Sequence, residues 1–278
     1  WRPKKFSDMV GQKSIVKTLC NQVSAGRIAH AYLFCGSRGT GKTSAAKIMA
    51  RAINCENPQN GDPCGECMSC KTIESDASFD VYEMDAASNS RVEEIRELLE
   101  KVDYPPQFGK YKVYIIDEVH MLSNSAFNAL LKTLEEPPEY MVFILATTEP
   151  QKLPSTILSR CQRYDFGRFT ESQIAGHLKK VAAESGAEAE EDALALIARA
   201  AEGGMRDALS IFDQVASFCQ GDITLEKVIK DLNLMDIEHY FQLTDLSLQG
   251  KCADVMLLLD NMLEQGMDAG HIVSGFAE

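Results

Sequence analysis

The sequence predicts an α/β fold in which a parallel β-sheet lies between helices and carries a phosphate-binding loop, followed by helical segments. Three observations predict this fold. A glycine-rich loop of the form GxxxxGK[ST] spans residues 36–43, between an apolar run and a helical pattern. Further apolar runs at 113–116 and 141–146 have the continuous character of strands that are buried on both faces. From residue 170 onward the pattern is helical, and we expect no further strand there.

Length and charge limit the possible classes of protein. With 278 residues, of which 45% are hydrophobic, the chain can form two or three globular units. It contains no run of about 18 apolar residues and no signal peptide, so we expect a soluble, cytoplasmic protein without a membrane partner. The formal charge of −13 argues against a broad nucleic-acid-binding surface, but it allows a local basic track. Because the chain starts at Trp1 and ends inside a helical pattern, we expect it to be a piece of a longer polypeptide.

The glycine-rich loop is expected to hold a nucleotide by its phosphates. Its glycines allow backbone angles closed to other residues, so that successive N–H groups can converge on a polyphosphate at a helix N-terminus. Lys42 would supply positive charge to the outer phosphates, and Thr43 would offer its hydroxyl to a Mg²⁺ ion. The alternative is a flexible Gly/Ser/Thr turn. The predicted nucleotide contacts of this segment are Gly36, Ser37, Arg38, Gly39, Thr40, Gly41, Lys42, Thr43 and Ser44.

The segment upstream of the loop is a candidate flap over the base of the nucleotide. Trp1, Pro3 and Val10 would give apolar contact to the base. Arg2 lies in the same segment and belongs to the same set of predicted contacts. The alternative is that this segment, with a helical pattern over residues 15–23, only packs on the sheet.

A four-cysteine pattern follows the helix after the loop. Turn-forming asparagine, proline and glycine residues surround the four thiols, which are Cys55, Cys64, Cys67 and Cys70. Four thiolates on tight turns can close a tetrahedral shell around Zn²⁺, and a closed shell leaves no open position for catalysis. The sequence therefore predicts a structural zinc module at residues 55–70. The alternatives are an iron–sulfur cluster and a redox-active CxxC pair.

Two acids follow the apolar run at 113–116. Because parallel sheets bind ligands at the carboxyl ends of their strands, these acids are expected at the edge that carries the phosphate loop. Asp117 suits coordination of Mg²⁺, and Glu118 suits orientation and deprotonation of the attacking water. The next strand delivers Thr147 and Thr148 to the same edge, where a hydroxyl can hold that water or sense the γ-phosphate. The alternatives are an acidic pair that caps the next helix and a threonine that bonds only to backbone.

Two arginines outside the loop are candidates for contact with a phosphate. Arg160 lies too far along the chain to reach its own phosphates easily, so we expect an arginine finger for a neighbouring subunit's nucleotide. A fifth, edge-type strand is predicted next, at 163–166. Arg206 starts a helix after a diglycine and could reach the γ-phosphate from a lid of three short helices. A plain surface arginine is the alternative for Arg206.

Together these residues resemble one family, the gamma/tau subunit of the bacterial DNA polymerase III clamp loader, which is an AAA+ ATPase. The resemblance covers essentially the whole chain, and the four-cysteine insertion is a rare marker within that family. The stretches that carry it are GSRGTGKT from residue 36, VYIIDEVHML from 113, LLKTLEEPP from 130, LATTEPQKLPSTILSRC from 145 and GGMRDALS from 203.

The resemblance implies a role for each matching residue. It places Thr148 at the sensor 1 position, Arg160 at the trans-acting finger and Arg206 at sensor 2. It also places the four cysteines at the family's zinc site. The residues that fall where the family follows primer–template DNA phosphates, along the inside of a spiral pentamer, are Arg91, Arg96 and Lys132.

The family's fold implies a five-stranded parallel sheet between helices with the four-cysteine zinc insertion, then a helical lid and a helical collar. On this basis we expect residues 1–168 to form the AAA+ nucleotide-binding domain. Residues 169–232 would form the lid, and residues 233–278 would form the first part of the collar.

The implied function is that of an ATPase motor subunit of the replicative clamp loader. With ATP, Mg²⁺ and a structural Zn²⁺, it would open the sliding clamp and load it onto primed DNA, in a pentamer with subunits of the delta and delta-prime types. Two alternatives belong to other classes. One is a different AAA+ DNA motor, such as a branch-migration helicase. The other is a non-catalytic structural clamp-loader subunit, which the presence of Lys42 and Glu118 disfavours.

Overall fold

The chain divides into two compact units. The computed structural model describes residues 1–75, 77–88, 102, 104–219, 221–232, 237–264, 269–270 and 272–273. The first unit comprises Trp1–Gln173 with Glu202–Asp207, and the second comprises Ile174–Ala201 with Ala208–Glu278. The division into three domains at residues 168 and 232 stays a prediction.

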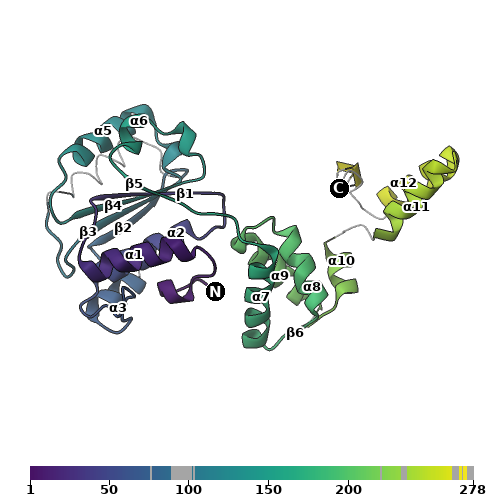
Figure 1. Cartoon of the computed structure of the whole chain (residues 1–278), viewed down its shortest axis with the longest axis horizontal. Coiled ribbons are helices and arrows are strands. Elements are labelled where there is room, and N and C mark those ends of the chain that lie inside the picture. The colour runs from purple at the N-terminus through teal and green to yellow at the C-terminus, as the bar shows by residue number, and fades with distance from the viewer. Residues whose placement is uncertain are drawn as a thin grey trace. The chain divides into compact units, whose positions relative to one another are not determined.

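The first unit is built on a five-stranded parallel sheet, as the sequence predicted (Figure 1). The strand order is β2-β3-β4-β1-β5, so β5 lies at an edge, also as predicted. Every residue of β1 and β4 is buried, because these strands lie in the interior of the sheet. The strands are β1 (Ala31–Cys35), β2 (Val81–Asp85), β3 (Lys112–Asp117), β4 (Met141–Thr147) and β5 (Gln162–Asp165).

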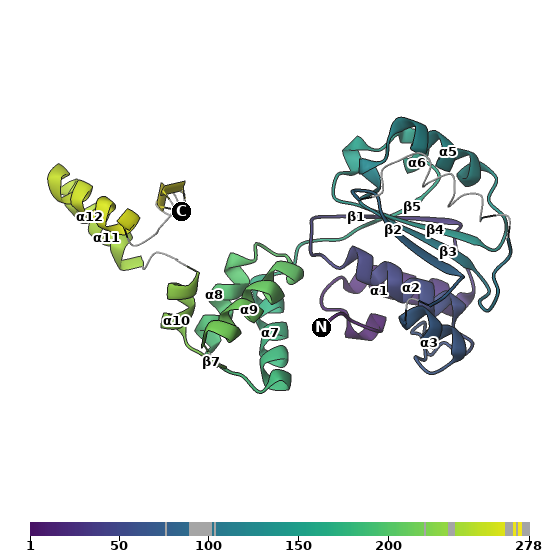
Figure 2. The same cartoon turned by 180° about the vertical axis from the view of Figure 1, so that it is seen from behind.

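Helices cover both faces of this sheet, and the side chains of each strand alternate between two cores (Figures 1 and 2). Phe34 and Ile115 belong to one core, and their neighbours Leu33 and Tyr114 belong to the other. Successive residues of a strand must therefore all be apolar, because they face the two cores in turn. This explains the continuous apolar runs in the sequence. The covering helices are α1 (Lys13–Ala25) and α2 (Lys42–Asn54) on the first core, and α5 (Asn124–Glu135) and α6 (Ser155–Leu158) on the second.

Parallel pairing brings the functional segments to one edge of the sheet. Cys35 at the end of β1 lies opposite Thr147 at the end of β4, and Asp85 at the end of β2 lies opposite Asp117 at the end of β3. The phosphate loop, the two acids and the two threonines therefore leave the sheet side by side.

The second unit is helical, and α7 and α9 begin in the last residues of the first unit. One expectation was wrong, because this region also contains a two-stranded parallel sheet of β6 (Glu188–Ala189) and β7 (Asp222–Ile223). Strands of two residues are too short to show an alternating pattern in the sequence. The helices are α7 (Glu171–Ser185), α8 (Glu191–Ala200), α9 (Met205–Cys219), α10 (Leu225–Asp231), α11 (Ile237–Leu248) and α12 (Cys252–Glu264).

The last two helices pack on each other around a small core. Leu243 of α11 and Met262 of α12 are buried there together with Ile272. Among the described residues, no helix combines the length and the apolar character that crossing a membrane would need.

A buried carboxylate fixes the loop that leads into β3. Asp80 is 2% exposed and accepts hydrogen bonds from the backbone N–H groups of Gln107, Phe108 and Gly109, at 2.6, 2.7 and 2.7 Å. These bonds hold the loop where it enters β3, the strand that carries Asp117 to the functional edge.

We expect Asp80→Asn to destabilise the first unit. The amide places an N–H₂ group among three buried N–H donors, so at least one charge-assisted bond is lost, and the free energy of unfolding should fall by about 2 kcal/mol. Urea denaturation measures this change. The matched variant Asp213→Asn, on the exposed side of α9, should leave stability within roughly 0.5 kcal/mol of wild type. Equal effects of the two variants would contradict the assignment.

Candidate nucleotide-binding and metal sites

The phosphate loop is closed on itself by its lysine. Nζ of Lys42 donates hydrogen bonds to the carbonyl oxygens of Gly36 and Ser37, both at 2.8 Å. Lys42 is only 5% exposed, and burial lowers the pKa of its ammonium group, while the carboxylates of Glu118 and Asp117 oppose that shift. Phosphate oxygens that replaced the two carbonyls would receive the same charge-assisted hydrogen bonds.

The first glycine of the loop is required by a close backbone approach. A Cβ atom at Gly36 would lie 2.4 Å from the carbonyl oxygen of Phe166, just after β5. Thr40 is fully buried, and its hydroxyl donates to the Ser37 carbonyl at 2.8 Å. Arg38, by contrast, has an exposed side chain. The loop is thus held by its own hydrogen bonds and by the backbone that follows β5, while Arg38 is exposed to solvent.

The two predicted magnesium ligands are brought together. Oγ1 of Thr43 donates to Oδ2 of Asp117 at 2.5 Å, and Oδ1 of Asp117 accepts from the backbone N–H of Glu118 at 2.9 Å. A hydroxyl and a carboxylate that meet beside a phosphate loop offer the oxygen ligands that Mg²⁺ takes. These residues therefore fit the ion, and their role as its ligands stays a prediction.

The second acid contacts the threonine at the end of the neighbouring strand. Oε2 of Glu118 accepts from the hydroxyl of Thr148 at 3.0 Å and from its backbone N–H at 3.3 Å. Nδ1 of His120 lies 3.4 Å from the same oxygen. The backbone of Glu118 has a φ of +46°, in the left-handed region. For a non-glycine residue this conformation costs about 1–3 kcal/mol, and such strain is concentrated at functional sites.

The two threonines after β4 have different surroundings. Oγ1 of the fully buried Thr147 accepts from the backbone N–H of Glu149 at 3.0 Å and lies 3.0 Å from Nδ1 of His120. Thr147 therefore matches the alternative of a threonine whose hydroxyl bonds to backbone, whereas the Thr148 hydroxyl donates to the carboxylate of Glu118. His120 was missed by the sequence analysis, and its only signal is its place two residues after Glu118 in the stretch DEVH.

The residues before α9 lie against the phosphate loop, within the first unit. The backbone N–H of Met205 donates to the Gly39 carbonyl at 3.1 Å. A Cβ atom at Gly39 would lie 3.3 Å from the backbone nitrogen of Arg206 and 3.1 Å from Cα of Gly204. These contacts bring the start of α9 beside the loop, and the sensor role of Arg206 stays a prediction.

Arg160 is engaged elsewhere. Its Nη2 lies 2.8 Å from Oε1 of Glu135, at the end of α5, and its Nη1 donates to the Thr156 carbonyl at 2.9 Å. About a third of the side chain is exposed. Its action on a neighbouring subunit stays a prediction.

Two of the predicted flap residues lie beside α2. Arg2 and Pro3 line a cavity of about 590 Å³, together with Ser44 of α2 and residues of α3 (Met68–Glu74) and β2. Trp1 is 52% exposed, and Val10 is half-buried. Their contact with a base stays a prediction.

Two contacts that the sequence analysis missed join the flap to the loop region. A Cβ atom at Gly41 would lie 3.5 Å from Cε of Met9. Gln12 donates from Nε2 to the Gly167 carbonyl at 2.6 Å and accepts from the Gly167 N–H at 3.2 Å. Neither residue belongs to a recognisable pattern, because each contact depends on the tertiary fold.

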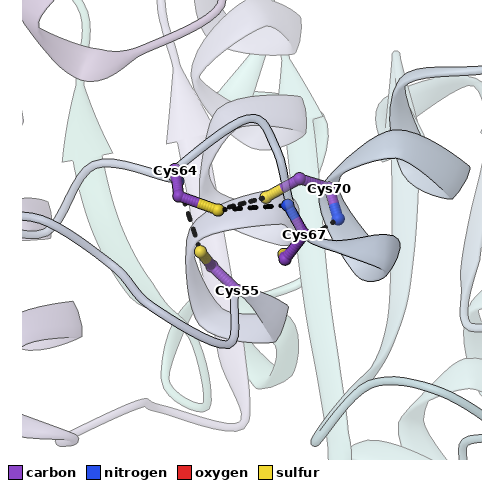
Figure 3. Close-up of side chains that lie close together, drawn as sticks. All are labelled: Cys55, Cys64, Cys67 and Cys70. Atoms are coloured by element: carbon purple, nitrogen blue, oxygen red, sulfur yellow. Dashed lines mark hydrogen bonds between the residues drawn. The ribbon is translucent and has the colours of Figure 1, made fainter.

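The four cysteines converge on one point (Figure 3). Their Sγ atoms all lie within 4.8 Å of one another, and Cys55 and Cys70 are buried. A tetrahedral shell with Zn–S bonds of 2.3 Å needs Sγ atoms about 3.8 Å apart, so the cluster fits zinc closely. Backbone N–H groups of Cys67 and Glu66 point at the Cys64 thiol and lower its pKa to about 6. They favour the thiolate, which is the form that binds metal.

The zinc module is anchored to the flap and to α1. The carboxylate of Asp62 accepts from the backbone N–H groups of Phe6 and Ser7, at 2.5 and 3.3 Å. A Cβ atom at Gly61 would lie 2.5 Å from the carbonyl oxygen of Cys20 in α1. The module therefore holds the segment that leads to Met9 and the phosphate loop.

Comparison with known sequences identifies the family. The chain is 49% identical over 273 residues to the DNA polymerase III subunit tau of Bacillus subtilis. This alignment covers 98% of this chain and 48% of that protein. It is 42% identical over 268 residues to the subunit gamma of Buchnera aphidicola from Acyrthosiphon pisum, which covers 96% of this chain and 74% of that protein. The chain belongs to the DNA polymerase III gamma/tau subunit family.

Two family descriptions match separate parts of this gamma/tau chain. The description "DNA polymerase III, delta subunit" matches residues 11–170, and "DNA polymerase III clamp loader subunit, ATPase lid domain" matches residues 173–221. The chain spans about half the length, or less, of the Bacillus protein and of the Escherichia coli subunit tau, at 48% and 42%.

A solved structure supports the AAA+ fold of this gamma/tau chain. The Thermotoga maritima RuvB Holliday junction branch migration motor aligns with a TM-score of 0.63 at 20% identity, over 88% of this chain and 78% of that one. At this identity the likeness concerns the fold. The sheet, the lid description and the four-cysteine cluster together confirm the predicted fold class.

Of the residues expected to contact DNA, only one can be placed. Lys132 is exposed in the last turn of α5. Arg91 and Arg96 lie outside the described residues.

We expect the gamma/tau chain to bind roughly one zinc ion at these thiolates. Because the ion ties together turns that have little apolar core, Cys64→Ser should lose the metal and lower the Tm by about 5 °C or more. Metal analysis and thermal unfolding measure both effects. Cys252→Ser, at an exposed cysteine outside the cluster, is the matched control. Full zinc content in the Cys64 variant would refute the site.

Proposed function

We propose that this chain is the ATP-hydrolysing motor of a bacterial clamp loader, which opens a sliding clamp and loads it onto primed DNA. The observation that carries the proposal is the meeting of Thr43 with Asp117 beside the phosphate-loop Lys42, in a chain aligned almost throughout with gamma/tau subunits. Such a chain works in the cytoplasm, where replication takes place.

ATP is the nucleotide for which each part of the site has a task. Its phosphates would replace the carbonyl oxygens of Gly36 and Ser37 on Lys42. A Mg²⁺ ion held by Thr43 and Asp117 would neutralise charge on the phosphates. Oε1 of Glu118 has no hydrogen-bond partner among the described residues, so it can accept a proton from the attacking water.

In a pentamer of subunits, the two candidate arginines would have separate tasks. Arg206 lies at the start of α9, beside the loop of its own chain, and would contact the γ-phosphate of that site. Arg160 pairs with Glu135 on the surface and would serve the nucleotide of the next subunit once the pair opens. Subunits of the delta and delta-prime types would complete the pentamer, and Lys132, with Arg91 and Arg96, would follow primer–template phosphates.

Two other functions are weighed against this one. A branch-migration motor shares the fold, but the likeness to RuvB is at 20% identity, against 42% to 49% for the gamma/tau relatives quoted above. A structural subunit without catalysis would not need the closed arrangement of Lys42, Thr43 and Asp117.

The ATPase rate of the full-length protein with its partner subunits tests the proposal. We expect sliding clamp and primed DNA together to raise this rate at least about tenfold, because they favour the aligned catalytic state. Lys42→Ala should abolish ATP binding, whereas Lys47→Ala, further along α2 and paired with Glu83, should retain it. A rate indifferent to clamp and DNA would instead indicate a general ATPase.

Arg160→Ala tests whether the site is shared between subunits. Because an arginine finger stabilises the transition state and not bound ATP, we expect a loss of stimulated turnover of about 100-fold or more, with ATP affinity unchanged. Arg163→Ala, at an exposed arginine paired with Asp165, is the matched control. Unchanged stimulated turnover in the Arg160 variant would remove the trans assignment.

A further inference from the structure

One buried side chain beside the acids has no role in the proposed function so far. His120 lies in the short helix η2 (Val119–Met121), which begins directly after Glu118, and its side chain is 6% exposed. Its Nδ1 lies 3.0 Å from Oγ1 of Thr147 and 3.4 Å from Oε2 of Glu118. Its Nε2 lies 3.4 Å from Oε1 of Glu149. The ring is thus inserted between two carboxylates and fixed by the closer contact to Thr147.

The hydrogen-bond partners indicate where the ring carries its proton. The carboxylate of Glu118 favours a hydrogen on Nδ1, because a lone pair there would face negative charge. Oγ1 of Thr147 already accepts from the Glu149 N–H and has a second lone pair for this hydrogen. Glu149 is itself held by Lys152, whose Nζ lies 2.7 Å from Oε1. Nδ1 therefore carries the hydrogen, which Oγ1 of Thr147 accepts at 3.0 Å in this structure, with Oε2 of Glu118 next in reach at 3.4 Å.

The Thr148 hydroxyl cannot serve two acceptors at once. It has one hydrogen, which it gives to Oε2 of Glu118 at 3.0 Å in this structure. If Thr148 senses the γ-phosphate, that hydrogen turns to a phosphate oxygen, and Oε2 loses its closest donor. The backbone N–H of Thr148 stays at 3.3 Å, and the side-chain donor next in reach is the N–H of His120 at Nδ1, which would turn from Thr147 to Oε2.

We propose that His120 is a positioning residue that retains Oε2 of Glu118 when Thr148 turns to the γ-phosphate. This inference rests on the proposed ATPase function. With Oε2 held by His120, the carboxylate pivots on one oxygen and presents Oε1, which has no partner among the described residues, to the attacking water. His120 touches neither water nor nucleotide, and it acts only through Glu118.

Three variants separate this role from a purely structural one. His120→Ala removes the donor. His120→Asn places an amide nitrogen near the position of Nδ1, whereas His120→Gln places one near the position of Nε2. A residue that only fills space or satisfies Glu149 would be replaced better by Gln than by Asn.

The variants are compared in the full-length protein with its partner subunits, sliding clamp and primed DNA. We expect His120→Ala to lower kcat by about 10- to 100-fold, because a misplaced base loses its alignment with the water, and to leave KM within twofold. His120→Asn should recover most of kcat, and His120→Gln should not. Binding of a non-hydrolysable ATP analogue and the Tm of each variant accompany the rates.

A double-variant cycle with Glu118→Gln provides a second readout. If His120 acts through Glu118, His120→Ala should cause almost no further loss in the Glu118→Gln background. A full additional loss in that background would overturn the proposal. An unchanged kcat in His120→Ala, or a rise in its KM alone, would also overturn the proposal. The same holds if His120→Gln, and not His120→Asn, recovers kcat. Failure of the proposed function would show differently, as a wild-type complex without stimulated hydrolysis.

Discussion

The contact between the Thr43 hydroxyl and the Asp117 carboxylate joins residues 74 positions apart, and the rest of the site is arranged around it. It exists because β1 and β3 run parallel on either side of β4 and end at the same edge. A shift of one residue in β3 would move the Asp117 side chain to the opposite face of the sheet. The buried faces of the sheet and the anchored loop at Asp80 therefore determine the distance on which the chemistry depends.

The sequence predicted the parts of the protein that consist of repeated local signals. The three central strands and the phosphate loop could be predicted because apolar runs and spaced glycines report directly on burial and backbone angles. The cysteine cluster could be predicted for the same reason, since its spacing reflects its geometry. Asp80, Met9 and His120 could not, because each is an ordinary residue whose role comes from partners far away in the chain. The strands β6 and β7 are too short for any period to appear.

The zinc module and the flap form one continuous support beside the nucleotide site. Asp62 holds the backbone of Phe6 and Ser7, and the following residues lead to Met9 against Gly41. An insertion that would hold a purely structural metal can thus affect the phosphate loop by fixing the position of the segment that contacts it. The role of the four thiolates would then be to support the segment at residues 6–9, at a distance from the phosphate loop.

The hydrogen bonds of Lys42 within the phosphate loop have a consequence for selectivity. Any anion that enters must first separate the ammonium group from two carbonyl oxygens, which then need water or other donors. Small ions such as sulfate or a lone orthophosphate bring few contacts to offset that loss, whereas a chain of linked phosphates brings many. A loop closed in this way would therefore favour a chain of linked phosphates, long enough to reach both the lysine and the helix that follows, over small simple anions.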